Sequence, residues 1–220
     1  MSHQQQTTEM LYSKANSLLS LGESKEANRL ISRLEQIDQL PEINYLKGKY
    51  AEVSGEKSKA LLFYKTYFWE QPNYLTLVKL VKNALSKKKI EDVIMLGEAY
   101  LNASPNDNQA RAFLSSKIMV HAPDKALQFI STRRNELFIM RNWEVSNNVA
   151  WLLLATNKPE KSLKFAQRAY ELQPNNTSVL VTYASSLVQN LQPKLAIYIL
   201  EEIPRPNNQI SSLIKELRAQ

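Results

Sequence analysis

The sequence predicts an all-α fold made of repeated pairs of antiparallel helices. Only 4 of the 220 residues are glycine, and the stretches between prolines are rich in Leu, Ala, Lys, Glu and Gln, which favour helices. Small or β-branched residues also recur at nearly constant spacing along the chain, with turn residues between them. A fixed period of 20 to 50 residues is typical of a helical-repeat protein and not of a sandwich or barrel.

Two rows of residues define the repeat. The first row recurs at steps of 33, 33, 33, 36 and 34 residues and comprises Ala27, Ala60, Val93, Ala126, Ser162 and Ala196. The second row lies twelve residues earlier in each unit and comprises Ala15, Gly48, Val81, Leu114, Ala150 and Ala184. Small side chains at these places allow antiparallel helices to cross at short distance. Because some members of the third and fourth units are larger, we expect these units to pack less regularly.

Glycine and proline punctuate this register. Gly22 and Gly55 lie between the two helices of the first and second units, where a backbone with positive φ is useful. Pro72, Pro105 and Pro174, each followed by Asn, close the second, third and fifth units because proline blocks continuation of the preceding helix.

The register divides the chain into segments with predicted roles. Residues 1–7 are expected to be a disordered start, and 133–142 an irregular insertion or helix extension that divides two arms. Residues 8–132 hold repeats one to four, 143–203 hold repeats five and six, and 204–220 hold a last amphipathic helix at about 208–219. The predicted repeats are 8–40, 41–73, 74–106, 107–132, 143–176 and 177–203.

These residues resemble the tetratricopeptide repeat (TPR) pattern, W-x2-L-G-x2-Y followed by A-x3-F, A and P. The second unit matches best, through Leu46, Gly48, Gly55, Ala60, Tyr64, Tyr67 and Pro72, and the fifth matches through Ala150, Ala166, Ala169 and Pro174. The resemblance covers about residues 8–203. It implies a right-handed α-solenoid of about six TPR-like helix pairs plus a C-terminal capping helix.

The match is uneven along the chain. The third and fourth units lack the motif glycine, and the first lacks the closing proline, so a related type of α-solenoid stays open for these units. The last two repeats resemble those of bacterial TPR proteins from envelope and exopolysaccharide systems.

The resemblance implies that the first helices line a concave face that holds a peptide or a partner helix. Positions one turn apart on that face are Tyr12, Asn16, Tyr45, Lys49, Val78, Lys82, Arg111, Ser115, Asn147, Trp151, Val181 and Ser185. Lys49, Lys82 and Arg111 form a cationic row that is suited to carboxylates or carbonyl oxygens, unless they are only solvated charges.

Aromatic residues on this face have two interpretations. Tyr45 and Trp151 are either interface anchors or partly buried packing residues, with packing favoured for Trp151. The run Phe63, Tyr64, Tyr67, Phe68 and Trp69 is interpreted as a core stripe on a second helix, with Tyr67 or Trp69 as the member most open to solvent.

No constellation of catalytic or metal-binding residues is evident, so we expect a protein without enzymatic activity, metal or cofactor. Cysteine is absent, and the two histidines, His3 and His121, have no convergent partners. No phosphate-binding glycine loop or nucleophile elbow occurs.

The expected partner is a protein or peptide, and the net charge of +7 favours acidic ones. A nucleic-acid-binding solenoid and a self-associating structural protein stay open as alternatives, although the first helices carry no repeated polar code for bases. No apolar run approaches the length of a membrane span and the start lacks signal-peptide features, so the chain is expected to be soluble, in either the cytoplasm or the periplasm.

Overall fold

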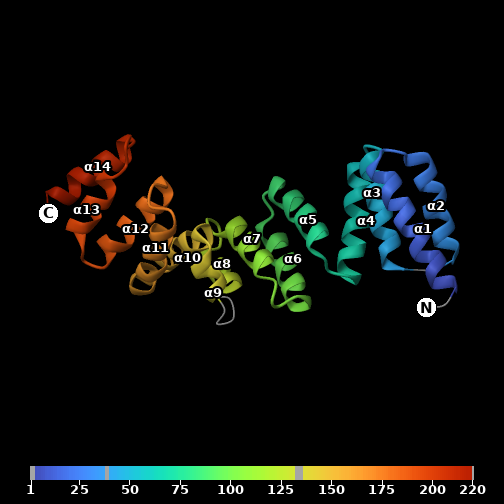
Figure 1. Ribbon diagram of the computed structural model, residues 1–220, viewed down its shortest axis with the longest axis horizontal. Coiled ribbons are helices and arrows are strands. Elements are labelled where there is room, and N and C mark those ends of the chain that lie inside the picture. The colour runs from blue at the N-terminus through green and yellow to red at the C-terminus, as the bar shows by residue number, and fades with distance from the viewer. Residues whose placement is uncertain (1–2, 38–39, 132–135, 220) are drawn as a thin grey trace. The chain divides into compact units, whose positions relative to one another are not determined.

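The computed structural model describes residues 3–37, 40–131 and 136–219, and these ranges contain helices but no strand. The chain forms two compact units, Met1–Pro105 and Asn106–Gln220, which are followed by colour in Figure 1. The predicted insertion at 133–142 therefore lies inside the second unit. No helix of the described ranges is long and apolar enough to cross a membrane.

The first unit consists of three helix pairs. Its helices are α1 (His3–Ser20), α2 (Ser24–Ile37), α3 (Pro41–Val53), α4 (Lys57–Glu70), α5 (Tyr74–Ser86) and α6 (Ile90–Ala103). Each odd-numbered helix packs on the next, and α1 also packs on α3. Because α1 begins at His3, the described part of the predicted disordered start is helical, which fits the helix propensity of its glutamines.

The second unit continues the pattern after a short interruption. Its helices are α7 (Asn108–Ile118), α8 (Pro123–Ile130), α9 (Glu136–Arg141), α10 (Trp143–Ala155), α11 (Pro159–Leu172), α12 (Thr177–Gln189), α13 (Pro193–Glu201) and α14 (Asn208–Arg218). The pairs are α7–α8, α10–α11 and α12–α13, and α14 packs on α13. The short α9 occupies the described part of the predicted insertion, whose residues 133–135 lie outside the described residues.

All twelve members of the two small-residue rows are buried. In the fifth repeat the two rows are also hydrogen-bonded, because Ser162 Oγ donates to the Ala150 carbonyl at 2.9 Å. The larger members Val81, Val93 and Leu114 are fully buried as well. Within the pairs that carry these larger residues, α5 contacts α6 and α7 contacts α8 less extensively than α3 contacts α4. The register found in the sequence is therefore the register of helix crossing.

Asparagine and aspartate begin the first helix of most pairs. The side chains of Asn73, Asp107, Asn142 and Asn176 accept hydrogen bonds from backbone N–H groups in the first turns of α5, α7, α10 and α12. These caps satisfy N–H groups that have no partner within the helix. Asn73, which directly follows Pro72, thus has a second role, because this turn residue also starts the next helix; after Pro174 the second of two asparagines, Asn176, has that role.

Five turns, each between the two helices of a pair, contain one residue in the left-handed conformation. Gly22 and Gly55 have φ of 81° and 79°, and Lys88, Asn157 and Leu191 have φ of 57°, 54° and 59°. Each lies five residues before the first-row residue of its own unit. Only the two glycines were predictable, because other residue types give no comparable local signal for this conformation. In three units that lack glycine, the packing of the helix pair therefore holds another residue in the same left-handed conformation.

Leu191→Gly is expected to raise the free energy of unfolding by about 0.5 to 1 kcal/mol. A left-handed conformation costs a non-glycine residue about 1 to 2 kcal/mol, and the extra freedom of glycine in the unfolded chain offsets part of that gain. Leu191 is 90% exposed, so little packing is lost. Urea denaturation measures the change. The reverse substitution Gly22→Ala has open space around its new methyl group and should lower stability by about 1 kcal/mol; destabilisation by Leu191→Gly would contradict the strain argument.

Candidate functional site

The residues predicted to bind a partner lie on the first helix of each pair, and we call this surface the first-helix face. In the first unit it comprises parts of α1, α3 and α5, and in the second unit parts of α7, α10 and α12. The two parts are considered separately below.

In the first unit, Lys49 and Asn16 are in direct contact between α3 and α1. Lys49 Nζ donates to Asn16 Oδ1 at 2.6 Å and to Ser20 Oγ at 3.1 Å. Partial burial, with the nearby charge of Lys79, lowers the pKa of Lys49, while the Glu52 charge opposes the shift. Neighbouring first helices therefore bring together two of the predicted residues, although much of the donor capacity of Lys49 is already used within the protein.

Three tyrosines surround the same part of the face. The Tyr45 ring lies 5.5 Å from the Tyr67 ring of α4, measured between centroids. Burial raises the pKa of Tyr12 to about 12, and the hydroxyls of Tyr67 and Tyr45 add to the shift. All three side chains thus stay neutral at physiological pH. Tyr12 and Tyr45 are half-buried, so they offer both a ring surface and a hydroxyl.

A polar network that sequence reasoning missed adjoins this cluster. Glu52 near the end of α3 accepts a hydrogen bond from Tyr64 Oη at 2.6 Å and pairs with Lys79 Nζ of α5 at 2.7 Å. Burial acts to raise the pKa of Glu52, but these hydrogen bonds and cations outweigh it and the pKa is lowered. The network joins α3, α4 and α5. The sequence shows only that Glu52 and Lys79 have opposite charges. Because they belong to different repeats, their spacing along the chain does not predict that they meet.

Lys82 is the one of the two predicted cations of this unit, Lys49 and Lys82, that is open to a partner. Its side chain is exposed on α5 and makes no ion pair or side-chain hydrogen bond with the described residues. Val78, one turn earlier, is half-buried. A partner carboxylate would therefore meet Lys82 with no internal competitor.

In the second unit, Arg111 has a structural contact. Its Nη1 donates to the Phe129 carbonyl at 2.7 Å, near the C-terminal end of α8. Burial lowers the pKa of the guanidinium. A cation at a helix C-terminus satisfies carbonyls that have no partner within the helix. Arg111 thus joins α7 to α8, a use that the sequence did not predict.

A hollow on the first-helix face lies between α10 and α12. It has a volume of about 320 Å³ and is lined by Trp151, Leu154, Ala155, Val181, Thr182, Ser185 and Gln189. Three of these, Trp151, Val181 and Ser185, were predicted, and the other four, Leu154, Ala155, Thr182 and Gln189, were missed. We call this hollow the Trp151 cleft. Trp151 is 36% exposed, so its packing role is partial and part of the indole is open to solvent.

Asn147 lies one turn before Trp151 on α10 and is only 7% exposed. Its Nδ2 donates to Ser178 Oγ at 3.3 Å, and its Oδ1 is buried without a hydrogen-bond partner among the described residues. Exchanging the two amide atoms would only transfer the deficit to the nitrogen. A buried polar atom without a partner costs about 1 to 3 kcal/mol. Because this oxygen is buried and Asn147 does not line the Trp151 cleft, the missing hydrogen bond is a local cost in stability and not a contact for a ligand.

Stacked helix pairs with small residues at their crossings, and with the first helices side by side, define a TPR-type α-solenoid. No family model matches the sequence, and no curated protein matches it. Solved structures do. A structure of MamA protein is 15% identical, covers 74% of this chain and 88% of its own, and superposes with a TM-score of 0.59.

Two further solved structures have the same arrangement. The C-terminal part of a TPR-containing protein from Cytophaga hutchinsonii is 14% identical, covers 93% of this chain and 80% of its own, and has a TM-score of 0.56. A chain of the APC/C hetero-tetramer Cut9–Hcn1 is 17% identical, with coverage of 96% and 46% and a TM-score of 0.51. At these identities the likeness establishes the fold.

Proposed function

We propose that this protein is a non-catalytic scaffold that binds a peptide or a partner helix on its first-helix face. The main support is the Trp151 cleft, where a partly exposed indole and apolar side chains lie beside the polar side chains of Thr182, Ser185 and Gln189. Apolar surface that also offers a few polar groups is typical of ligand sites, and tryptophan is enriched among interface anchors.

The chemistry of the cleft suits an extended or helical segment with one bulky apolar side chain. That side chain would stack on Trp151 and contact Leu154 and Val181, while the backbone of the segment would form a hydrogen bond with the Gln189 side chain. In the first unit, the partner would be met by Tyr12, Tyr45 and exposed Lys82. The net charge of +7 favours acidic segments.

Trp151→Ala is expected to weaken peptide binding at least tenfold. Peptides would be selected on the wild-type protein from a random library, and their dissociation constants measured by fluorescence anisotropy. Loss of a central aromatic anchor typically costs 2 kcal/mol or more, which supports this magnitude. Trp69→Ala is the control, because Trp69 is also partly exposed but lies on the second helix α4.

Two outcomes would contradict the proposal. One is that every selected peptide binds Trp151→Ala and wild type equally, while Lys82→Glu has no effect either. The other is tight binding of single-stranded nucleic acid that falls steeply with salt, in the absence of any peptide binding.

We also propose a bacterial envelope or polysaccharide-secretion assembly as the setting. This rests on the resemblance of repeats five and six, residues 143–203, to the repeats of such systems. Crosslinking in native cells followed by mass spectrometry tests it. Recovery of cytosolic partners alone would contradict it.

A further inference from the structure

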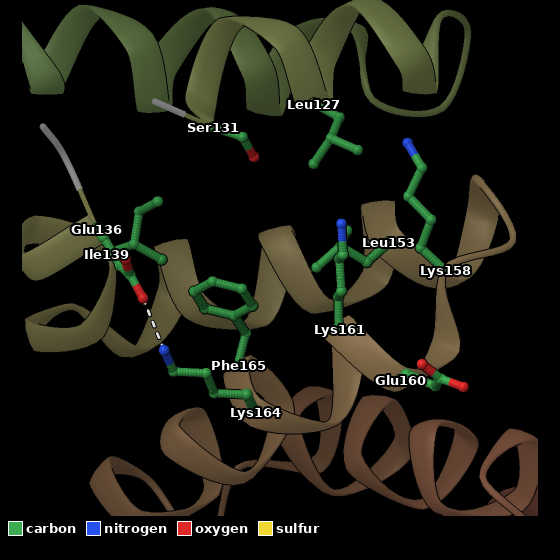
Figure 2. Close-up of a pocket in the computed structure, with 10 residues that line it drawn as sticks. All are labelled: Leu127, Ser131, Glu136, Ile139, Leu153, Lys158, Glu160, Lys161, Lys164 and Phe165. Carbon is green, nitrogen blue, oxygen red and sulfur yellow. Dashed lines mark hydrogen bonds and ion pairs between the residues drawn. The ribbon is translucent and has the colours of Figure 1, made fainter. Parts of the chain in front are cut away.

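A second cavity lies in the second unit, on the side of the second helices. It has a volume of about 560 Å³ and is lined by Leu127, Ser131, Glu136, Ile139, Leu153, Lys158, Glu160, Lys161, Lys164 and Phe165 (Figure 2). We call it the α8–α11 cavity. None of its residues belongs to the Trp151 cleft, so the two sites are independent.

The irregular step in the repeat accounts for the cavity. The first row advances 36 residues from Ala126 to Ser162, where the preceding steps are 33. The second helix of this unit, α8, ends early at Ile130, and the separate short helix α9 follows it before α10. Helix α9 packs on α10 and touches α11, whereas α8 packs on α10 without extensive contact to α11. Second helices that would otherwise be neighbours are thus separated, and the apolar side chains between them are left beside an open space.

The base of the cavity is apolar. Leu127, Ile139 and Leu153 are buried, and the Phe165 ring of α11 projects into the space below α8, which carries Leu127 (Figure 2). Four apolar side chains from four helices meet here, which is the arrangement that small-molecule sites usually have. The volume also lies within the range of about 300 to 1,000 Å³ for such sites. An α-helix about 10 Å wide would fit over roughly one turn only.

The rim of the cavity carries three lysines, of which one has an ion-pair partner among the described residues and two have none. Lys164 Nζ pairs with Glu136 at 2.7 Å. Lys158 and Lys161 make no ion pair or side-chain hydrogen bond with the described part of the chain, and their ammonium groups point into the cavity in Figure 2. The Glu160 carboxylate points away from them. An anionic group above the apolar base would therefore meet two ammonium groups that have no competing carboxylate.

We propose that the α8–α11 cavity binds a small organic anion with an apolar body, such as a medium-chain carboxylate. The apolar chain would contact Leu153 and Phe165, and the head group would accept hydrogen bonds from Lys158 and Lys161. Charge-assisted hydrogen bonds of this kind fix the orientation of the ligand, and burial of its methylene groups adds to the affinity.

Decanoate, below its micellar concentration, is the probe. In methyl-resolved NMR titrations of the full chain, we expect saturable shifts confined to the methyl groups of Leu127, Ile139 and Leu153. Decylammonium, which has the same chain and the opposite charge, should bind at least tenfold more weakly. Equal affinity for both probes, or shifts spread over the whole protein without saturation, would overturn the proposal.

The matched variants separate the cavity from general electrostatics. Lys158→Glu/Lys161→Glu should weaken decanoate binding at least tenfold, whereas Lys57→Glu/Lys65→Glu on the exposed side of α4 changes the net charge equally and should leave it unchanged. Lys158→Gln/Lys161→Gln, which avoids repulsion with Glu160, should give an intermediate loss. Equal binding by the two Glu double variants would overturn the assignment of the head-group site.

Discussion

Gly48→Leu is expected to lower the free energy of unfolding by about 1 to 3 kcal/mol, with the result near the upper end of that range. Even the first carbon of a side chain at position 48 would lie 2.6 Å from Tyr64 Cε1 and 2.7 Å from its Cδ1. The ring has little room to move, because Tyr64 is 1% exposed and its hydroxyl is held by Glu52. Burial raises the pKa of Tyr64, and the hydrogen bond to Glu52 adds to the rise.

Urea denaturation of the full chain provides the measurement. Gly48→Ala should be less destabilising than the leucine variant, because it places one added carbon against Tyr64 where leucine places four, while both variants gain up to about 1 kcal/mol in helix propensity. The decisive comparison is Gly48→Leu in a Tyr64→Ala background, where the space vacated by the ring should relieve most of the cost. Additive effects of the two substitutions would show that Gly48 and Tyr64 do not interact in the way described.

Ser162→Ala is expected to lower the free energy of unfolding by about 1 to 3 kcal/mol, although alanine is the usual residue of the first row. Ser162 is fully buried, and its hydroxyl bonds the Ala150 carbonyl at 2.9 Å and Ser186 Oγ at 2.7 Å. Removal of the hydroxyl leaves the fully buried Ser186 hydroxyl without this partner. Its desolvation is then uncompensated.

A double-mutant cycle distinguishes this cost from a loss of packing. Ser186→Ala should also destabilise the protein, and Ser162→Ala/Ser186→Ala should cost less than the sum of the single variants, because no hydroxyl is left unpaired. Thermal unfolding monitored by circular dichroism gives the three values. If the double variant lost as much free energy of unfolding as the two single variants together, or more, the hydrogen bond between the hydroxyls would contribute little. The loss of packing would then account for the destabilisation.

The candidate site was only partly visible in the sequence. Trp151, Val181 and Ser185 could be placed on one face because their spacing follows the helix period and the repeat register. Leu154 and Thr182 were missed since they lie beside the positions one turn apart that the register selects. Ala155 and Gln189 were missed because each lies one turn beyond the two positions taken from its helix. Arg111 was treated like the other cations because nothing local signals its bond to the Phe129 carbonyl, which depends on how α7 meets α8.

The sequence by itself determined the all-α class, the repeat register and the residues at the helix crossings. These follow from local physics, since helix propensity, periodic small residues and turn-forming residues act over one or two turns of chain. The tertiary structure alone decided where positive φ is kept without glycine, as at Leu191, and how Glu52 is joined to Lys79. It also decided that the extra residues between Ala126 and Ser162 leave a cavity beside unpaired lysines. Such features arise where separate helices meet, and spacing within one helix carries no information about that meeting.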